Sequence, residues 1–431
     1  MSSLNTDLLY GILLSSGPHT AAELGARARI SQPSVSRAVQ ALRTSREDWL
    51  EFRAGRTIRY AVARPVRGLP LRLPVWRRGE RYGELMSVSG GGFLFLPVAG
   101  GAQYSAALPW FMQDMRPQGY IGRAYCHAQA AMLGLPEELS RWTEVDVLFA
   151  LAQPSFDAPG NLELGQVRRA PDCPVVTALS AYFDALAEQS VAGSQPGSSA
   201  GGEHPKFAVA YQTPAGEVRP VIVKFSPSLD NPVAERWRDL LLAEHLAGQV
   251  LGEAGFPVAE ARIVLGETRC HLESLRFDRG ELGVATLGAV DDEFIGSRRS
   301  WAASATALRQ SGLLMPEAER AIATLEAFGR LIGNTDMHFG NVSLFWREVE
   351  GRFQFGLAPV YDMLPMLYAP EKGEIVPRPL EIRAPIAAPG DAALALWLAH
   401  EFWQRIADDT RVSRSFATLA AENARRVAMC R

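Results

Sequence analysis

The chain has 431 residues, of which 47% are hydrophobic and 21% are charged, and its formal net charge is -3. This length exceeds a single ordinary core and the composition is that of a folded protein, so we expect two to four globular domains. The small net charge argues against a chain that coats nucleic acid along its whole length, and four scattered cysteines without a CxxC pair argue against a disulfide framework or a zinc site.

The N-terminal sequence MSSLNTDLLYGILLSSG starts a helical pattern and lacks the basic start and the cleavage site of a signal peptide. No stretch of the chain reaches the roughly 18 unbroken apolar residues that a membrane span needs. We therefore expect a cytoplasmic protein that makes no membrane contact.

Residues 1–65 predict three helices followed by a β-hairpin. A second, short helix covers residues 21–28, and the third lies in RISQPSVSRAVQALRTS, where Ser31 is expected to cap the N-terminus. After it, WLEFRAGRTIRYAV alternates apolar and polar residues around a turn at Gly55. The apolar face of the first helix consists of Leu8, Leu9, Ile12 and Leu13.

The third predicted helix turns a polar face outward, and this face suits base edges and phosphates. Residues 1–68 hold ten arginines against five acids, a local surplus of +5 in a net acidic chain. We therefore predict that residues 1–65 form a winged helix-turn-helix domain that binds duplex DNA. A three-helix protein-interaction module with a solvated arginine face is the alternative. The residues expected to contact DNA are Gln32, Ser36, Arg37, Gln40, Arg56 and Arg59.

The segment that follows, residues 63–74, is rich in proline and arginine and is typical of a linker. From Pro74, short alternating runs such as VWRRGERYGEL and GGFLFLPV predict a small β-rich module that ends near Ala106. A mixed stretch with two helical segments continues to about Ala192 and carries no recognisable site.

Residues 193–207, GSQPGSSAGGEHPKF, form a glycine-rich loop beside the predicted strands FAVAYQT and VRPVIVKF. Backbone N–H groups of such a loop, here including Gly201 and Gly202, cradle phosphate oxygens. Lys206 closes the loop and Lys224 lies in the second strand, although the whole chain has only three lysines. Because a lysine in a buried strand needs an anionic partner, we predict that both lysines bind phosphate.

Glu244, in the helical segment ERWRDLLLAEHLAGQVLGEAG, is the candidate partner of Lys224. A strand lysine that bridges phosphate and a helical glutamate orders the small lobe of nucleotide phosphotransferases. The alternative is that Glu244 is an ordinary solvated residue of its helix.

The stretch LIGNTDMHFGNVSLFW, residues 331–346, places one Asp, one His and two Asn between apolar runs. Asp336 and Asn341 are five residues apart, a separation at which the Asp can hold an acceptor hydroxyl while the Asn reaches a magnesium ion on ATP. Asp362, in LAPVYDMLPM, supplies a second metal carboxylate after a short hairpin. We therefore predict phosphoryl transfer with ATP and Mg²⁺ as cofactors. The catalytic candidates are Asp336, His338 and Asn341, and the metal ligands are Asn341 and Asp362.

Five segments together resemble a known family: SSAGGEHPK, VIVKF, ESLRFDR, GNTDMHFGN and YDMLP. Their order and spacing are those of the HipA-like serine/threonine kinases, the toxin kinases of bacterial toxin–antitoxin modules. With its N-terminal winged helix, the chain is most similar to the YjjJ-type (HipH-type) branch. The resemblance covers about residues 70–431 and implies an α+β fold of two kinase-like lobes. Residues 70–270 would form a β-rich lobe with a helical insert, and residues 271–431 a mostly helical lobe.

The resemblance also implies roles for single residues. It assigns the catalytic base to Asp336, the magnesium ligands to Asn341 and Asp362, and the phosphate lysine to Lys224. The segment from Leu275 to Phe277 would be the hinge that binds adenine.

Autophosphorylation is implied at Ser199, with Ser198 as a second site. The further partners that the resemblance implies are a protein substrate, an antitoxin and a second copy of the chain in a homodimer. Two features depart from the family pattern. Gly340 stands where these kinases commonly have a lysine before the magnesium asparagine, so a charge that stabilises the transferring phosphoryl group is missing. The DNA-binding domain is fused to the kinase, whereas a typical HipA-like kinase relies on a separate antitoxin for that task.

Two other functions are open from the sequence. A DNA-binding transcriptional regulator would use a degenerate kinase fold as a sensor or dimerisation body, and a magnesium-dependent DNA nuclease would use the same acids. The glycine-rich loop and the strand lysine favour the kinase over the nuclease, because a nuclease needs no site for a triphosphate.

Overall fold

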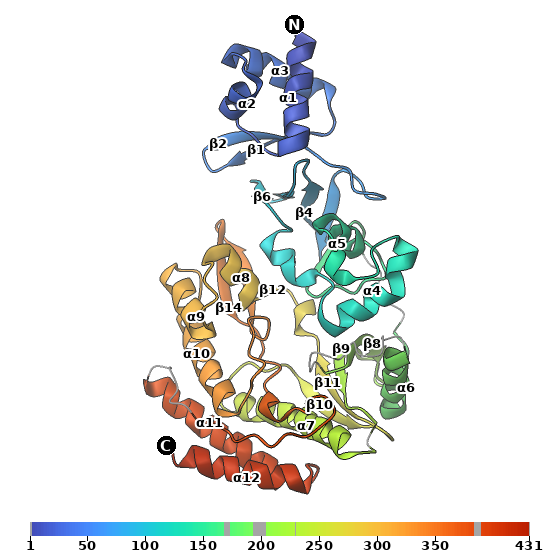
Figure 1. The fold of residues 1–431 in the computed structure, drawn as a ribbon, viewed down its shortest axis with the longest axis vertical. Helices are drawn as coiled ribbons and strands as arrows, with labels where there is room; N and C mark the ends of the chain where they lie inside the picture. Colours follow the sequence, from blue (N-terminus) through green and yellow to red (C-terminus); the bar gives the residue numbers. More distant parts are fainter. Residues whose placement is uncertain (1, 168–172, 193–203, 229, 383–388, 431) are drawn as a thin grey trace. The chain divides into compact units, whose positions relative to one another are not determined.

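The computed structural model describes residues 2–167, 173–192, 204–228, 230–382 and 389–430 (Figure 1). The chain forms two compact units, Met1–Arg116 with Met132–Arg169 and Pro117–Ala131 with Ala170–Arg431. Within the described residues, helices are mixed with four separate sheets, in agreement with the predicted α+β class. None of the helices in these ranges combines the length and the apolar character needed to cross a membrane.

The first unit begins with three helices and a two-stranded antiparallel sheet, in the predicted order. These elements are α1 (Ser2–Ser16), α2 (Ala21–Ala28), α3 (Gln32–Ser45), β1 (Trp49–Ala54) and β2 (Thr57–Val62). The hairpin turns at Gly55, whose φ of 62° favours a residue without a side chain. Leu9 and Leu13 are fully buried, whereas Leu8, predicted for the same face, is 43% exposed. The buried face of α1 is therefore narrower than predicted and centres on Leu9 and Leu13, which lie four residues apart on one side of the helix.

The N-termini of α2 and α3 are capped differently. Before α2, the N–H of Glu23 donates to the hydroxyl of Thr20 at 3.2 Å, and the N–H of Thr20 donates to the carboxylate of Glu23 at 2.7 Å. Ser31 precedes α3 as predicted, but its side chain makes no capping hydrogen bond. Its hydroxyl lies 3.0 Å from the hydroxyl of Ser34 instead.

A five-stranded antiparallel sheet completes the first unit, with the strand order β6-β5-β4-β3-β7. Four of its strands come from the stretch predicted to be β-rich, and β7 joins them from residues far along the chain. The sequence did not indicate β7, because three residues are too few for a recognisable alternation. The elements are β3 (Leu73–Arg77), β4 (Glu80–Ser87), β5 (Phe93–Pro97), β6 (Gln103–Ser105), η1 (Trp110–Met115), η2 (Leu139–Arg141), α5 (Glu144–Leu151) and β7 (Leu162–Leu164).

The second unit contains a four-stranded antiparallel sheet of order β10-β11-β9-β8. On one face of the sheet, Val221 and Val223 of β9 pack with Phe183 of α6. On the opposite face, Leu272 of the neighbouring strand packs with Leu241 of α7. The sheet is therefore covered by α6 on one face and by α7 on the other. The elements are α4 (Gly119–Leu133), α6 (Leu179–Ala192), β8 (Lys206–Gln212), β9 (Val218–Phe225), α7 (Pro232–Glu253), β10 (Ala261–Leu265) and β11 (Cys270–Leu275).

The rest of the second unit is largely helical and carries one small sheet of order β12-β13-β14. Helices α11 and α12 pack side by side, and α11 also packs against α10 and α7 (Figure 1). Helix α10 ends where the polar stretch that precedes β13 begins. The elements are η3 (Phe277–Arg279), β12 (Gly283–Thr286), α8 (Leu287–Phe294), α9 (Trp301–Gln310), α10 (Pro316–Leu331), β13 (Ser343–Val349), β14 (Arg352–Leu357), η4 (Met366–Tyr368), α11 (Pro389–Asp408) and α12 (Arg414–Ala428).

Candidate active site

Strands β8 and β9 bring two of the three lysines together. Their antiparallel register pairs Lys206 directly with Lys224, so both side chains leave the same face of the sheet. The neighbouring pair, Phe207 and Val223, faces the other side, where Val223 is fully buried. Because like charges directly opposite each other destabilise a sheet, this pair of lysines favours an anion over their face.

Lys224 is held between two carboxylates. Its Nζ lies 2.7 Å from both carboxylate oxygens of Glu244 on α7, and it also donates to Oδ1 of Asp362. Lys224 and Glu244 are each only 9% exposed, so water screens their ion pair weakly. The structure thus gathers three of the predicted residues, Lys224, Glu244 and Asp362, into one cluster.

Burial and the charges of neighbouring side chains determine the pKa values in this cluster. Burial alone would lower the pKa of Lys224, but the charges of Asp362 and Glu244 outweigh it and raise that pKa. Burial raises the pKa of Glu244, and the charge of Lys224 offsets this only in part. Burial would also raise the pKa of Asp362, yet the charges of Lys224 and Lys206 together lower it to about 2. Asp362 is therefore ionised at neutral pH and Lys224 is charged.

The backbone fixes the position of the Asp362 carboxylate. The φ of Asp362 is 57°, a left-handed conformation that is uncommon for a residue with a Cβ and that is often found at functional positions. Its N–H donates to Oε1 of Glu244 at 3.3 Å, and its carbonyl accepts from the side-chain amide of Asn334 at 3.3 Å. Two residues earlier, Val360 pairs with Val258 in a parallel bridge.

The loop between α10 and β13 holds Asp336 and Asn341 together. The side-chain amide of Asn341 donates to the carbonyl of Asp336 at 2.9 Å, which leaves its own carbonyl oxygen as a ligand for a cation. The N–H of Asp336 donates to Oδ1 of Asn334 at 3.1 Å. Since Asn334 also contacts Asp362, it joins the two parts of the predicted site, a role that the sequence analysis did not assign. The Asp336 side chain is exposed, whereas Asn341 is buried.

In the same loop, the imidazole of His338 folds back onto Gly340. Nδ1 of His338 accepts from the N–H of Gly340 at 3.0 Å, so the neutral ring carries its proton on Nε2. A Cβ at position 340 would lie 3.0 Å from Nδ1 and Cε1 of this ring, which gives a physical reason for glycine there. The carbonyl of His338 accepts from the indole N–H of Trp301 at 3.2 Å, and the hydroxyl of Tyr361 donates to the carbonyl of Gly340 at 2.7 Å.

The predicted adenine hinge begins at Leu275, the last residue of β11. The N–H of Leu275 donates to the carbonyl of Glu260 at 2.8 Å. The ring of Phe277 packs against the rings of Tyr361 and Phe345, with centroid distances of 5.9 Å and 6.1 Å. Because Tyr361 precedes Asp362, this aromatic contact connects the hinge segment to the segment that carries the metal candidate.

The donor atoms of the site fit magnesium better than a resident transition metal. In the described part of the chain, no group of three or more His, Cys, Asp or Glu side chains is arranged to hold a metal ion. Asp362 and Asn341 instead offer oxygen ligands, and Mg²⁺ is commonly held by one or two protein ligands together with substrate phosphates and water. The side-chain oxygens of these two residues are therefore of the kind that Mg²⁺ prefers.

His204 belongs to this neighbourhood and was missed by the sequence analysis. It is only 6% exposed, and its ring meets Trp237 of α7 edge-on with a centroid distance of 4.5 Å. Burial, followed by the charge of Lys224, lowers the pKa of His204 to about 3, so the imidazole is neutral. The sequence shows that His204 stands two residues before Lys206. Its burial could not be predicted in the same way, because it depends on the contact with Trp237.

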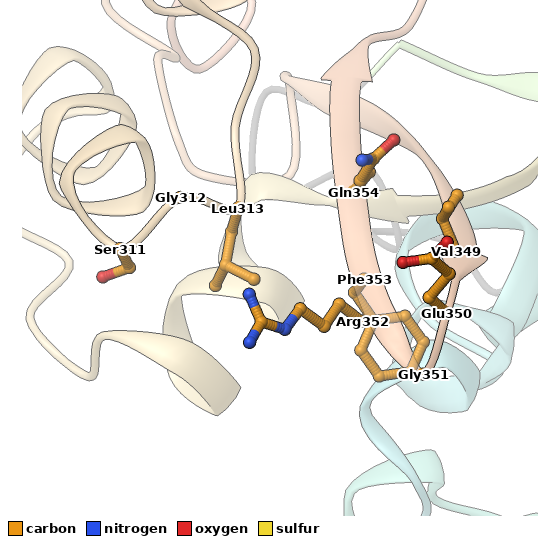
Figure 2. A pocket seen from close by; sticks show the side chains of 9 residues that line it. All are labelled: Ser311, Gly312, Leu313, Val349, Glu350, Gly351, Arg352, Phe353 and Gln354. Atoms are coloured by element: carbon orange, nitrogen blue, oxygen red, sulfur yellow. The ribbon is translucent and has the colours of Figure 1, made fainter.

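Four other predicted residues, Ser198, Ser199, Gly201 and Gly202, lie outside the residues that the structure describes. An open hollow of about 910 Å³ lies elsewhere in the second unit, between the segment after α9 and the β13–β14 hairpin (Figure 2). In Figure 2, Arg352 extends across the hollow toward Leu313. None of the predicted site residues lines this hollow.

The candidates for DNA contact form a separate group in the first unit. Arg56 is exposed at the hairpin turn. Arg59 is half-buried, since its guanidinium donates to the carbonyl of Pro18 at 3.3 Å and lies 3.9 Å from the carboxylate of Glu23. The four candidates on α3 are all exposed, and they are Gln32, Ser36, Arg37 and Gln40.

Known proteins match both the middle and the C-terminal part of the chain. The family model described as "YjjJ-like toxin, middle domain" matches residues 73–170, and the one described as "HipA-like C-terminal domain" matches residues 198–429. Toxin YjjJ of Escherichia coli (strain K12) is 37% identical over 432 residues, which cover 95% of each of the two chains.

A solved structure shares the fold. A chain of the Shewanella oneidensis MR-1 toxin–antitoxin complex of HipA, HipB and operator DNA superimposes with a TM-score of 0.55. The match covers 83% of this chain and 96% of that chain at 14% sequence identity. The superposition shows a HipA-like fold. At this low identity it does not show the activity, which depends on the residues of the site.

Proposed function

Because the chain belongs to the family of HipA-like toxins, in the branch of the YjjJ-like toxins, we propose that it is an ATP- and magnesium-dependent serine/threonine protein kinase of the HipA toxin type. The main support is the cluster in which the buried Lys224 contacts both Glu244 and Asp362. Asn334 contacts both Asp362 of this cluster and Asp336 of the loop that carries Asn341, which supports one common site for the acid, the amide and the lysine that phosphoryl transfer requires.

Each residue has a role in this proposal. ATP supplies the phosphoryl group, and Mg²⁺ neutralises charge on its phosphates. Asp336, exposed at the loop, accepts the proton of the substrate hydroxyl. Asp362 and the amide oxygen of Asn341 hold the metal, and Lys224 binds the phosphates while Glu244 orients it.

Further residues would bind the rest of the nucleotide. Lys206, opposite Lys224 in the sheet, adds a second positive charge on the phosphate side. The segment from Leu275 to Phe277 receives the adenine, and the backbone at Gly201 and Gly202 cradles phosphate oxygens.

Incubation of the full-length protein with labelled ATP, Mg²⁺ and a cell extract, followed by mass spectrometry, tests the kinase proposal. We expect phosphoserine or phosphothreonine with the native protein and none with Asp336→Asn or Asp362→Asn. The matched control is Asp292→Asn, at an exposed aspartate of α8, which should transfer phosphate normally.

Two outcomes would favour a different function. Tight binding of ATP without any transfer would support a regulator with a degenerate kinase fold. Cleavage of supercoiled plasmid that is lost in Asp336→Asn would support a nuclease.

We also propose that residues 1–65 form a winged helix-turn-helix domain that binds duplex DNA. The polar residues of α3 are exposed together, and Arg37 is among them. In full-length protein, Arg37→Ala should weaken binding to promoter DNA of its own gene and reduce the slope of log affinity against log salt by about one. Arg347→Ala, in the second unit, is the control that should leave this slope unchanged. Salt-independent binding by the native protein would favour a protein-interaction module instead.

Regulation and partners follow from the same proposal. We propose autophosphorylation at Ser199 or Ser198, which should be detectable in protein purified from cells and absent from Asp336→Asn. A protein substrate, an antitoxin and a second copy of the chain are the proposed protein partners. The similar fold in the Shewanella complex comes from an assembly with HipB and operator DNA, which supports a search for an antitoxin.

A further inference from the structure

His204 is the most poorly satisfied polar side chain near the candidate active site. It is 6% exposed, and neither of its ring nitrogens has a hydrogen-bond partner among the residues that the structure describes. A buried donor and a buried acceptor without partners are unfavourable for folding, and such groups in folded proteins call for an explanation.

Each of the other buried histidines in the described part of the chain has at least one hydrogen-bond partner. Nε2 of His271 lies 2.7 Å from a carboxylate oxygen of Asp184, and Nδ1 of His19 lies 2.8 Å from the carbonyl oxygen of Gly17. His204 therefore differs from its counterparts, although its burial is comparable to theirs.

Two contacts fix the place of His204 in the fold. Its ring is held edge-on against the indole of Trp237, with the ring planes at 79°. Next to it, the carbonyl of Pro205 accepts from the N–H of Phe225 at 3.1 Å, and Phe225 follows Lys224 in β9. The imidazole is thus positioned by packing, at the end of the sheet where Lys206 and Lys224 pair.

The electrostatic surroundings of His204 point to an anion as its missing partner. Burial is the largest cause of its lowered pKa; the charges of Lys224 and Lys206 act in the same direction, and that of Asp362 opposes them. An imidazole carries at least one N–H donor in either protonation state. A donor beside two ammonium groups suits an anionic oxygen, such as those of a phosphate chain.

We propose that His204 binds the nucleotide directly, by donating a ring N–H to a phosphate oxygen of the nucleoside triphosphate that Lys206 and Lys224 hold. This inference rests on the proposed kinase function and adds to it a phosphate-binding residue. The proposed contact also explains why histidine occupies this position, although a phenylalanine ring of similar shape would pack against Trp237 equally well.

Replacement of His204 by phenylalanine separates a binding role from a structural one. His204→Phe keeps a flat ring against Trp237 and removes two unpaired polar atoms. In full-length protein without nucleotide, its melting temperature should therefore equal or exceed that of the native protein. Its affinity for a non-hydrolysable ATP analogue with Mg²⁺ should fall at least about tenfold, the effect of one lost hydrogen bond to a charged group.

Three controls make this test specific. Adenosine, which has no phosphates, should bind His204→Phe and native protein equally. His204→Gln keeps a donor and should retain most of the affinity, which also covers the case that His204→Phe does not fold. His127→Phe changes an exposed histidine of α4 and should affect neither quantity.

A lower melting temperature of His204→Phe with unchanged affinity for the analogue would overturn the proposal, because the ring would then be structural. An equal loss of affinity for adenosine and for the analogue would also overturn it. If the native protein binds neither compound, the proposed nucleotide site itself fails, and this outcome is distinct from unchanged binding by the variant.

Discussion

The ammonium group of Lys224 neutralises two carboxylates, that of the buried Glu244 and that of Asp362, whose side chain is 29% exposed. Removal of the lysine would leave two acids facing each other. Such an arrangement is costly, because the loss of one partner from a buried ion pair leaves an uncompensated charge.

We expect Lys224→Met to abolish phosphoryl transfer and to lower the free energy of unfolding by about 3–5 kcal/mol at neutral pH. The pKa of Glu244 is already raised by burial, and it rises further when the lysine that lowers it is absent. A carboxyl whose pKa is higher in the folded state than in the unfolded state destabilises the fold increasingly as the pH rises above the ordinary value near 4.5. The loss in Lys224→Met should thus be larger at pH 8 than at pH 5 in urea unfolding.

The control for this comparison is Lys372→Met, the same change at an exposed lysine. It should leave both transfer and stability unchanged. A loss in Lys224→Met that is the same at both pH values would show that Glu244 does not carry the effect.

Gly340 allows the imidazole of His338 to rest against its backbone, and this leads to a second expectation. Gly340→Ala places a Cβ 3.0 Å from the ring and should displace it. We expect the rate of phosphoryl transfer to fall about tenfold while the affinity for nucleotide stays close to native, because the hydrogen bond to Nδ1 that orients the ring is lost.

The matched control is Gly356→Ala in β14, where an added Cβ meets no atom within 4 Å. In a His338→Ala background, Gly340→Ala should cause no further loss. An additive loss in the double variant would show that Gly340 acts by another route.

At the scale of single elements, α2 and α3 differ in the hydrogen bonds that cap their N-termini. Thr20 and Glu23 exchange two hydrogen bonds at the start of α2, whereas Ser31 makes no capping bond at the start of α3. We expect Thr20→Ala to lower the free energy of unfolding of the first unit by about 1 kcal/mol, and Ser31→Ala to change it little. Chemical unfolding followed by circular dichroism compares the two, and an equal loss in both would contradict this assignment of the caps.

At the scale of the whole molecule, the division into two compact units predicts how ligands affect stability. A ligand that binds only the folded form stabilises it, by about 2.7 kcal/mol at one hundred times its dissociation constant. In calorimetry of the full-length protein, an ATP analogue with Mg²⁺ should raise the transition of the second unit, and duplex DNA should raise that of the first. If either ligand shifted both transitions equally, the units would not unfold independently.

Local patterns predicted part of this fold and site. Residues 21–28 satisfied helical spacing and form α2 in the structure, and the acid expected to pair with Lys224 does so. Contacts between residues that are far apart in the chain could not be predicted from the sequence. The pairing of Lys206 with Lys224 depends on where the β8–β9 turn closes, and a slip of one residue would have put them on opposite faces. The burial of His204 and the bridging role of Asn334 depend on residues distant in the chain, so no local sequence pattern predicts either feature.

The contact between Lys224 and Asp362 has a consequence for the order of binding. Under the proposed function, a free magnesium ion at Asp362 would compete with the ammonium of Lys224, whereas a bound triphosphate would offer that ammonium another partner and free the carboxylate. The site would therefore favour the magnesium–nucleotide complex over either component alone. Calorimetric titration should therefore show weak binding of Mg²⁺ alone, and Lys224→Met should bind free Mg²⁺ more tightly than the native protein does, even though the variant cannot use it.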